Sequence, residues 1–242
     1  MYPADYIPLF LLLFFGLAVG LGFVFFTVVR ALSRRAHRLE EAAKRNIGQV
    51  FSPSPFPQRP TAWMAVRSAT PEAVKLALGL GRSTPCSWVE GLAGSHEFFI
   101  GPPVHGWVIV TGLGLPHPDD DIDASFLFLT TLSRKLGHIQ FFHSDRILQH
   151  HAWARLDDGC VTRGFAWAGN TVWNQGAKTL PETELGLHCF DYGDDSATFS
   201  EIQRNIEGLP LLAARWSLDP AEVKLHTLRQ ATGIAGESAR IY

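Results

Sequence analysis

The chain opens on a long apolar run and then changes to mixed apolar and polar positions. From Tyr6 to Val29 there are 24 residues and no charge. A bilayer core needs about 20 apolar residues in a helix, so this run predicts one membrane-spanning helix and an anchor over residues 1–30. A cleaved signal peptide would need basic residues before a shorter apolar core, whereas the only charge before this run is that of Asp5.

Basic residues crowd the C-terminal side of the predicted span. They are Arg30, Arg34, Arg35, Arg38, Lys44 and Arg45, and the N-terminal side has no Lys or Arg. Cytoplasmic flanks carry the excess of Lys and Arg. The pattern therefore predicts a single-pass cell-membrane protein with its N-terminus outside, its domain in the cytoplasm and membrane lipid as one partner.

Two glycines in the span, Gly16 and Gly20, form a G-x-x-x-G spacing. This spacing lets two membrane helices approach closely and predicts a homodimer. Glycine is also common in membrane helices for other reasons, and that alternative stays open.

A juxtamembrane helix and a proline-rich linker are predicted over residues 31–60. Apolar residues recur at three- and four-residue spacing over 31–49, which is typical of an amphipathic helix. Pro53, Pro55, Pro57 and Pro60 follow, and alternating prolines favour an extended spacer. The linker is the predicted boundary of a domain over residues 61–242.

The first part of this domain has the pattern of an α+β fold. Strands are predicted at 63–68, 98–101, 106–111 and 138–143. One helix should begin with Thr70 as its cap, run to about Leu80 and end at Gly81, and a second should span Asp119–Leu136. The resulting β-α-β-β-α-β order is the ferredoxin-like order.

The rest of the domain should add a hairpin over 149–168 and a helical C-terminal part. A further strand is predicted at 172–175. A helix start at Pro181-Glu182 and short helices at Phe199–Ile206, Leu209–Trp216 and Pro220–Leu228 follow, the last capped by Asp219.

The hairpin separates large from small side chains. A three-residue loop, Asp157-Asp158-Gly159, would set Trp153 opposite Arg163 and leave Ala152, Ala154 and Gly164 on the other face. We expect the Asp119–Leu136 helix to cover this small face. The large face is either a second buried layer under the C-terminal helices or a binding surface, whose predicted residues are His151, Trp153, Arg155, Arg163 and Phe165.

Charge and cysteine content narrow the function. The formal net charge of -2 gives no electrostatic case for nucleic acid. Three widely spaced cysteines give no disulfide framework and suit a reducing compartment.

No complete catalytic, metal or cofactor motif is present in the sequence. Gly112-Leu113-Gly114 lacks the third glycine of a dinucleotide fingerprint, and no HExxH occurs. We therefore predict no metal and no cofactor, and a membrane-tethered, non-catalytic binding or scaffold module with a protein partner. The alternatives are an enzyme with an unfamiliar site around His143, Asp145 and His151, or an immunity-type protein that neutralises a toxin at a bacterial inner membrane.

Overall fold

The computed structural model describes residues 59–238, except residues 94, 195, 225–227 and 229–230. All of them belong to one compact unit over Pro55–Tyr242. Within this described part of the chain, no helix combines the length and the apolar character that a membrane crossing requires. The span predicted at 6–29, its Gly16 and Gly20 spacing and the 31–49 helix lie outside the described residues and stay predictions.

The domain is a mixed α+β structure built on one nine-stranded antiparallel sheet. The predicted α+β class is therefore confirmed. The strand order is β2-β9-β3-β4-β1-β5-β6-β7-β8. The strands are β1 Ala62–Arg67, β2 Leu80–Cys86, β3 Phe98–Ile100, β4 Trp107–Thr111, β5 Ile139–Asp145, β6 His150–Asp157, β7 Cys160–Trp167, β8 Thr171–Gln175 and β9 Gly233–Ser238.

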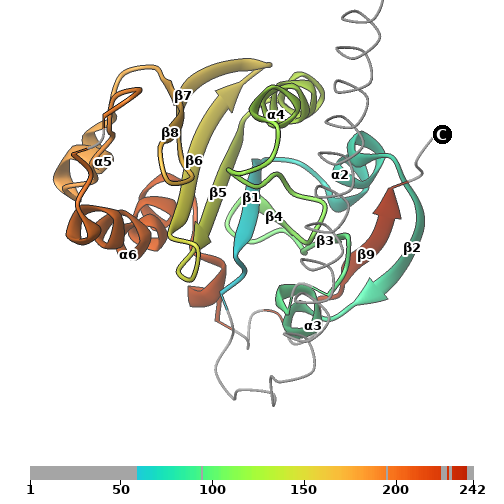
Figure 1. Cartoon of the computed structure of the whole chain (residues 1–242). Coiled ribbons are helices and arrows are strands. Elements are labelled where there is room, and N and C mark those ends of the chain that lie inside the picture. Colours follow the sequence, from blue (N-terminus) through green and yellow to red (C-terminus); the bar gives the residue numbers. More distant parts are fainter. Residues whose placement is uncertain (1–58, 94, 195, 225–227, 229–230, 239–242) are drawn as a thin grey trace, which may run out of the picture. The chain divides into compact units, whose positions relative to one another are not determined.

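Helices cover both faces of the sheet (Figure 1). Side chains of α2 and α4 share one apolar cluster with alternate residues of the central strands, and those of α3 and α6 share the other, beside α5. The helices are α2 Pro71–Leu78, α3 Trp88–Leu92, α4 Ile122–Leu136, α5 Leu180–Glu184 and α6 Phe199–Trp216, with a 3-10 turn at Pro220–Glu222.

Strand β1 explains why the sheet is buried on both sides. Trp63 and Ala65 point into the α6-side cluster, whereas Met64 and Val66 point into the α4-side cluster, and all four are fully buried. Side chains alternate across a strand, so a nearly continuous apolar run such as β1 fits only between two helical layers.

Four predicted strands are neighbours in the order β3-β4-β1-β5, and the two predicted helices, α2 and α4, pack on one face of them. The prediction for α2 was wrong at its end: the helix stops at Gly79, which has the left-handed φ of 67° that a helix C-cap favours, and not at Gly81.

Two elements, β2 and α3, stand between α2 and β3 and were not predicted. Strand β2 has the sequence LGRSTPC, whose apolar residues do not alternate and which includes Pro85. It is an edge strand, where proline is tolerated because one row of N–H groups needs no ladder partner.

The C-terminal part has one long helix, α6, where two short helices were predicted. Helix α6 runs unbroken through the buried Pro210, because its apolar stripe from Ile202 to Leu212 packs on the sheet along the whole length. Of the predicted helix at 220–228, the structure describes a 3-10 turn at Pro220–Glu222, which Asp219 caps as expected, and a helical Leu228, whereas residues 225–227 lie outside the described part.

Candidate functional site

The hairpin β6–β7 closes with a different turn from the predicted one. Asp158 and Gly159 both have positive φ, 48° and 82°, as a two-residue type I′ turn requires. Asp157 pairs with Cys160, and one residue later the register shifts so that Arg155 pairs with Arg163 and Thr162 is left over as a bulge. The three-residue loop was therefore wrong, and Trp153 lies opposite Phe165 rather than Arg163.

The predicted separation of large and small side chains is nevertheless confirmed. Beyond the bulge, a two-residue turn plus one extra residue in β7 leaves the same residues on each face as a three-residue loop would, and Val161, between turn and bulge, changes face. Trp153 and Phe165 belong to the α6-side cluster, and Ala152 and Ala154 belong to the α4-side cluster. Helix α4 packs on the small face, as predicted, where β6 and β7 lie beneath it.

The large face is an interior layer. His151, Trp153 and Phe165 are fully buried, Arg163 is 2% exposed, and Arg155 is half-buried. Their cover is α5, α6 and the segment between β8 and α6. A partner could reach the four buried residues only if this cover moved, and their binding role stays a prediction.

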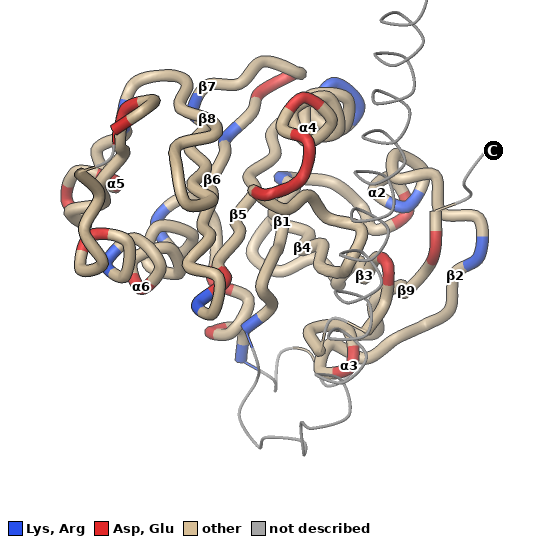
Figure 2. Tube along the Cα trace, in the orientation of Figure 1, with Lys and Arg blue, Asp and Glu red and all other residues tan. Residues whose placement is uncertain are grey.

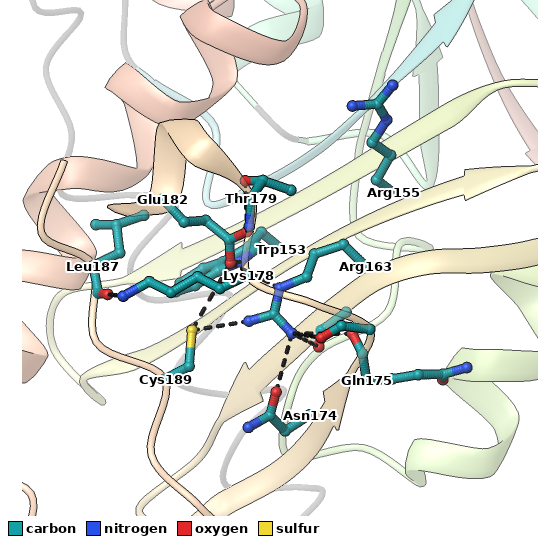
Figure 3. A network of polar contacts seen from close by, with 12 residues as sticks. Trp153, Arg155, Arg163, Asn174, Gln175, Lys178, Thr179, Glu182, Leu187 and Cys189 are labelled. Carbon is teal, nitrogen blue, oxygen red and sulfur yellow. Dashed lines mark hydrogen bonds and ion pairs between the residues drawn. The ribbon is translucent and has the colours of Figure 1, made fainter. Parts of the chain in front are cut away.

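Glu182 of α5 is the centre of a polar network beneath this cover (Figure 3). Its Oε1 accepts hydrogen bonds from Trp153 Nε1 at 2.7 Å and from Arg163 Nε at 2.8 Å. Its Oε2 accepts from the backbone N and the hydroxyl of Thr179, at 2.7 and 2.6 Å. Both oxygens of a fully buried carboxylate are therefore used by the protein itself.

The guanidinium of Arg163 is also bonded within the protein through all three of its nitrogens. Its Nη1 donates to the carbonyls of Gly164, Gln175 and Gly176 and to Asn174 Oδ1, and its Nη2 lies 2.9 Å from Cys189 Sγ. Figure 3 shows these partners converging on Arg163 from β8 and from the loop after α5. The network thus fixes the 174–189 segment onto the sheet.

Cys189 contributes the thiol of this network. Burial raises the pKa of Cys189 to about 11, even though the neighbouring Arg163 acts in the opposite direction. Because the thiolate is the reactive form, a thiol with this pKa is inert near neutral pH. The network is thus built on the buried ion pair of Arg163 and Glu182, with the Cys189 thiol beside it.

The three residues of the predicted enzyme site do not converge. His143 of β5 lies on the α4 side of the sheet, whereas His151 lies on the α6 side, where it stacks on Trp153 and its Nε2 accepts a hydrogen bond from Asn205 Nδ2 at 3.0 Å. Asp145 caps the β5–β6 turn through the backbone N–H groups of Ile147 and Leu148. Adjacent His150 and His151 point to opposite faces, as a strand requires.

Two further histidines, His117 and His150, lie near His143 on the α4 side of the sheet. The ring of His117 lies 4.8 Å from that of His143, and His150 Nδ1 lies 3.8 Å from Asp119 Oδ1 on the same side of the sheet. Burial, and then the neighbouring His117 and His150, hold the pKa of His143 well below its usual value. Among the described residues, no three His, Cys, Asp or Glu side chains are placed to hold a metal ion.

A second cysteine lies beside a histidine where β2 meets α3. Cys86 Sγ is 3.6 Å from His96 Nε2. Burial and the nearby Glu90 carboxylate raise the pKa of Cys86, so the pair holds a thiol rather than a thiolate. Sequence reasoning missed it because the two residues come together only through the unpredicted strand β2.

Glu182 was also missed as a network residue, although one signal was readable. Thr179-Leu180-Pro181-Glu182 has the T-x-x-E spacing of a capping box, and the structure forms that box. The spacing predicts only the contacts to Thr179, and nothing local indicates Arg163 or Trp153.

Comparisons with protein-family models, with curated proteins and with solved structures found no match to this chain.

Proposed function

We propose that the described domain is a non-catalytic binding or scaffold module, tethered to a membrane by residues 6–29, with its N-terminus outside and its domain in the cytoplasm. The observation that carries the proposal is the saturation of the Glu182 network. Trp153 and Arg163 of the hairpin both donate hydrogen bonds to Glu182, and these internal contacts hold α5 on the sheet. The parts of the domain left to meet a partner are its outer surfaces.

The proposal also includes the finer architecture. We infer that β1, α2, β3, β4, α4 and β5 form a ferredoxin-like unit into which β2 and α3 are inserted. The adjacency β3-β4-β1-β5 with both helices on one face supports this view. It carries no function, because many unrelated functions share such folds. Homodimerisation through Gly16 and Gly20 belongs to the same proposal.

Site-specific photo-crosslinking of the full chain in its own membrane tests the binding role. A photoreactive residue is placed at one exposed apolar position at a time, among them Tyr192, Phe199 and Leu211. A binding module should give a crosslinked product at neighbouring positions and none at the others. Uniform labelling at every position, or none anywhere, would count against it.

The same crosslinking experiment separates a binding module from an enzyme. The product should persist in His143→Gln and Asp145→Asn variants, because a surface contact does not use those side chains. In a strain that lacks the gene, the wild-type chain and the two variants are compared for their ability to restore the phenotype. If only the wild type restores it while all three give the crosslink, the enzyme around His143 and Asp145 would be favoured.

A further inference from the structure

The turn between β5 and β6 holds two apolar side chains out in solvent. Ile147 is 86% exposed and Leu148 is 56% exposed, and Arg146 beside them is also exposed. Leu113, which follows β4, is 59% exposed. Since β1 lies between β4 and β5 in the sheet, these three apolar residues flank the start of β1, and strand spacing sets the two loops about 10 Å apart.

The geometry of this turn is fixed rather than loose. Asp145 Oδ1 accepts hydrogen bonds from the backbone N of Ile147 at 2.8 Å and of Leu148 at 2.9 Å. Gln149 has a φ of 59°, which turns the chain back into β6, and Asp145 pairs with His150 across the turn. The two apolar side chains are therefore presented together on a shaped tip.

The position of the tip suggests what it contacts. The backbone N of Ser144 donates to the carbonyl of Thr61 at 2.8 Å, so the base of the turn is joined to the first residues of the domain. In Figure 1 the start of β1 and the β5–β6 turn lie at the same end of the sheet. The part of the chain that joins the domain here, residues 1–58, includes the predicted span.

We infer that the Arg146–Leu148 tip, with Leu113, rests in the interfacial region of the bilayer that anchors the chain. This inference rests on the proposed tether at residues 6–29. The chain between Val29 and Arg59 is long enough to lay this end of the sheet on the membrane. A tether turns a weak contact by a few side chains into an intramolecular one at high effective concentration, and apolar tips flanked by a basic residue suit the headgroup boundary.

Charge attraction plays the smaller part in this contact. The acidic loop before α4 adjoins the turn, because Asp119 Oδ1 lies 3.8 Å from His150 Nδ1, and Figure 2 shows that loop and the start of α4 as a continuous acidic stretch. Arg146 itself directly follows the acidic Asp145 in the chain. We expect burial of Ile147 and Leu148 to dominate, with little dependence on anionic lipid.

The test uses the full chain in vesicles of phosphatidylcholine, with and without a minor share of phosphatidylglycerol. An environment-sensitive NBD fluorophore is attached to Ile147→Cys in a Cys160→Ser background, which removes the exposed native thiol. The matched control label is at Leu76→Cys on α2, where the native side chain is 83% exposed.

The expected result is a blue-shifted Ile147 label that nitroxides on lipid acyl chains quench several-fold more than they quench the Leu76 label, in both kinds of vesicle. A label at Ile147 that aqueous iodide quenches as strongly as it quenches the Leu76 label would overturn the inference. Protection from both quenchers would also overturn it, because residues 31–49 or a second copy of the chain would then cover the tip. If alkaline carbonate extracts the chain from the vesicles, the proposed tether at residues 6–29 is wrong. This outcome is distinct from the two quenching results that would overturn only the contact of the tip.

Discussion

At the residue scale, Glu182 shows how a polar group can organise a buried region. It is fully buried and bonds Arg163 and Trp153, which stand 19 and 29 positions before it in the chain. Such partners cannot be predicted from local spacing, because only the fold brings them together. What the sequence did allow was the T-x-x-E cap and the placement of Trp153 and Arg163 on one face.

The ion pair predicts a large loss of stability on truncation. Glu182→Ala leaves the buried guanidinium of Arg163 without its carboxylate, so we expect the free energy of unfolding to fall by about 3–5 kcal/mol. Urea denaturation of the fragment 55–242 would measure it. The control is Glu184→Ala on the same helix, whose partner Arg215 is exposed and whose loss should cost about 0–1 kcal/mol. Equal midpoints for the two variants would contradict the assigned role.

The buried histidines predict an acid-sensitive fold. Burial lowers the pKa of His151 to about 4 from an ordinary value of 6.5. The folded state thus binds fewer protons than the unfolded state, and stability is fully present above pH 6.5 and decreases as pH falls toward about 4. The difference corresponds to roughly 3 kcal/mol for His151, and the low pKa of His143 acts in the same direction.

Measurement between pH 6.5 and 5 avoids most carboxylate titration. The slope of the unfolding free energy against pH should be positive in the wild type and smaller in His151→Gln, whatever the absolute stability of the variant. A variant slope equal to that of the wild type would show that His151 is not buried in its neutral form.

At the element scale, the hairpin separates what patterns can predict from what they cannot. Side-chain size along β6 and β7 was enough to assign the two faces. The pairing was not predictable in the same way, because a type I′ turn with the bulge at Thr162 preserves the faces beyond the bulge while it displaces the pairs there by two residues. Strands β2 and β9 were missed for another reason: LGRSTPC and GIAGES lack apolar alternation, and their pairing with each other joins distant parts of the chain.

Gly164 gives an element-scale test of this register. A Cβ there would lie 2.7 Å from ring atoms of Trp173 on β8, so the close neighbour is this ring and not α4 as expected. We predict that Gly164→Leu lowers the unfolding free energy by about 1–3 kcal/mol through overpacking. A double-mutant cycle with Trp173→Ala should show strong coupling, since the smaller residue gives room to the leucine. Additive effects would place the clash elsewhere.

At the scale of the whole molecule, local sequence patterns predicted the α+β fold class but not the complete strand order of the sheet. The α+β class and the helices on one face of four central strands follow from readable periodicity. The position of β9 between β2 and β3 does not, because residues 233–238 return from the far end of the chain. A strand can pair with any free edge of the sheet, including edges formed by distant parts of the chain. A short stretch of sequence therefore does not determine its partners.

Orientation across the membrane is the remaining property of the whole chain. Arg30, Arg34, Arg35 and Arg38 follow the predicted span and no basic residue precedes it, so the domain is expected in the cytoplasm. Its three cysteines, Cys86, Cys160 and Cys189, are all free, which suits a reducing compartment.

A reporter enzyme that needs disulfides to fold should therefore be inactive when fused after Tyr242, and a fluorescent reporter that folds in the cytoplasm should be active. Replacing the four arginines by serine and placing four lysines before Tyr6 should reverse both readings, because the basic flank would then precede the span. An active disulfide-dependent reporter on the unaltered chain would put the domain, and the membrane face that its β5–β6 turn can touch, on the outer side.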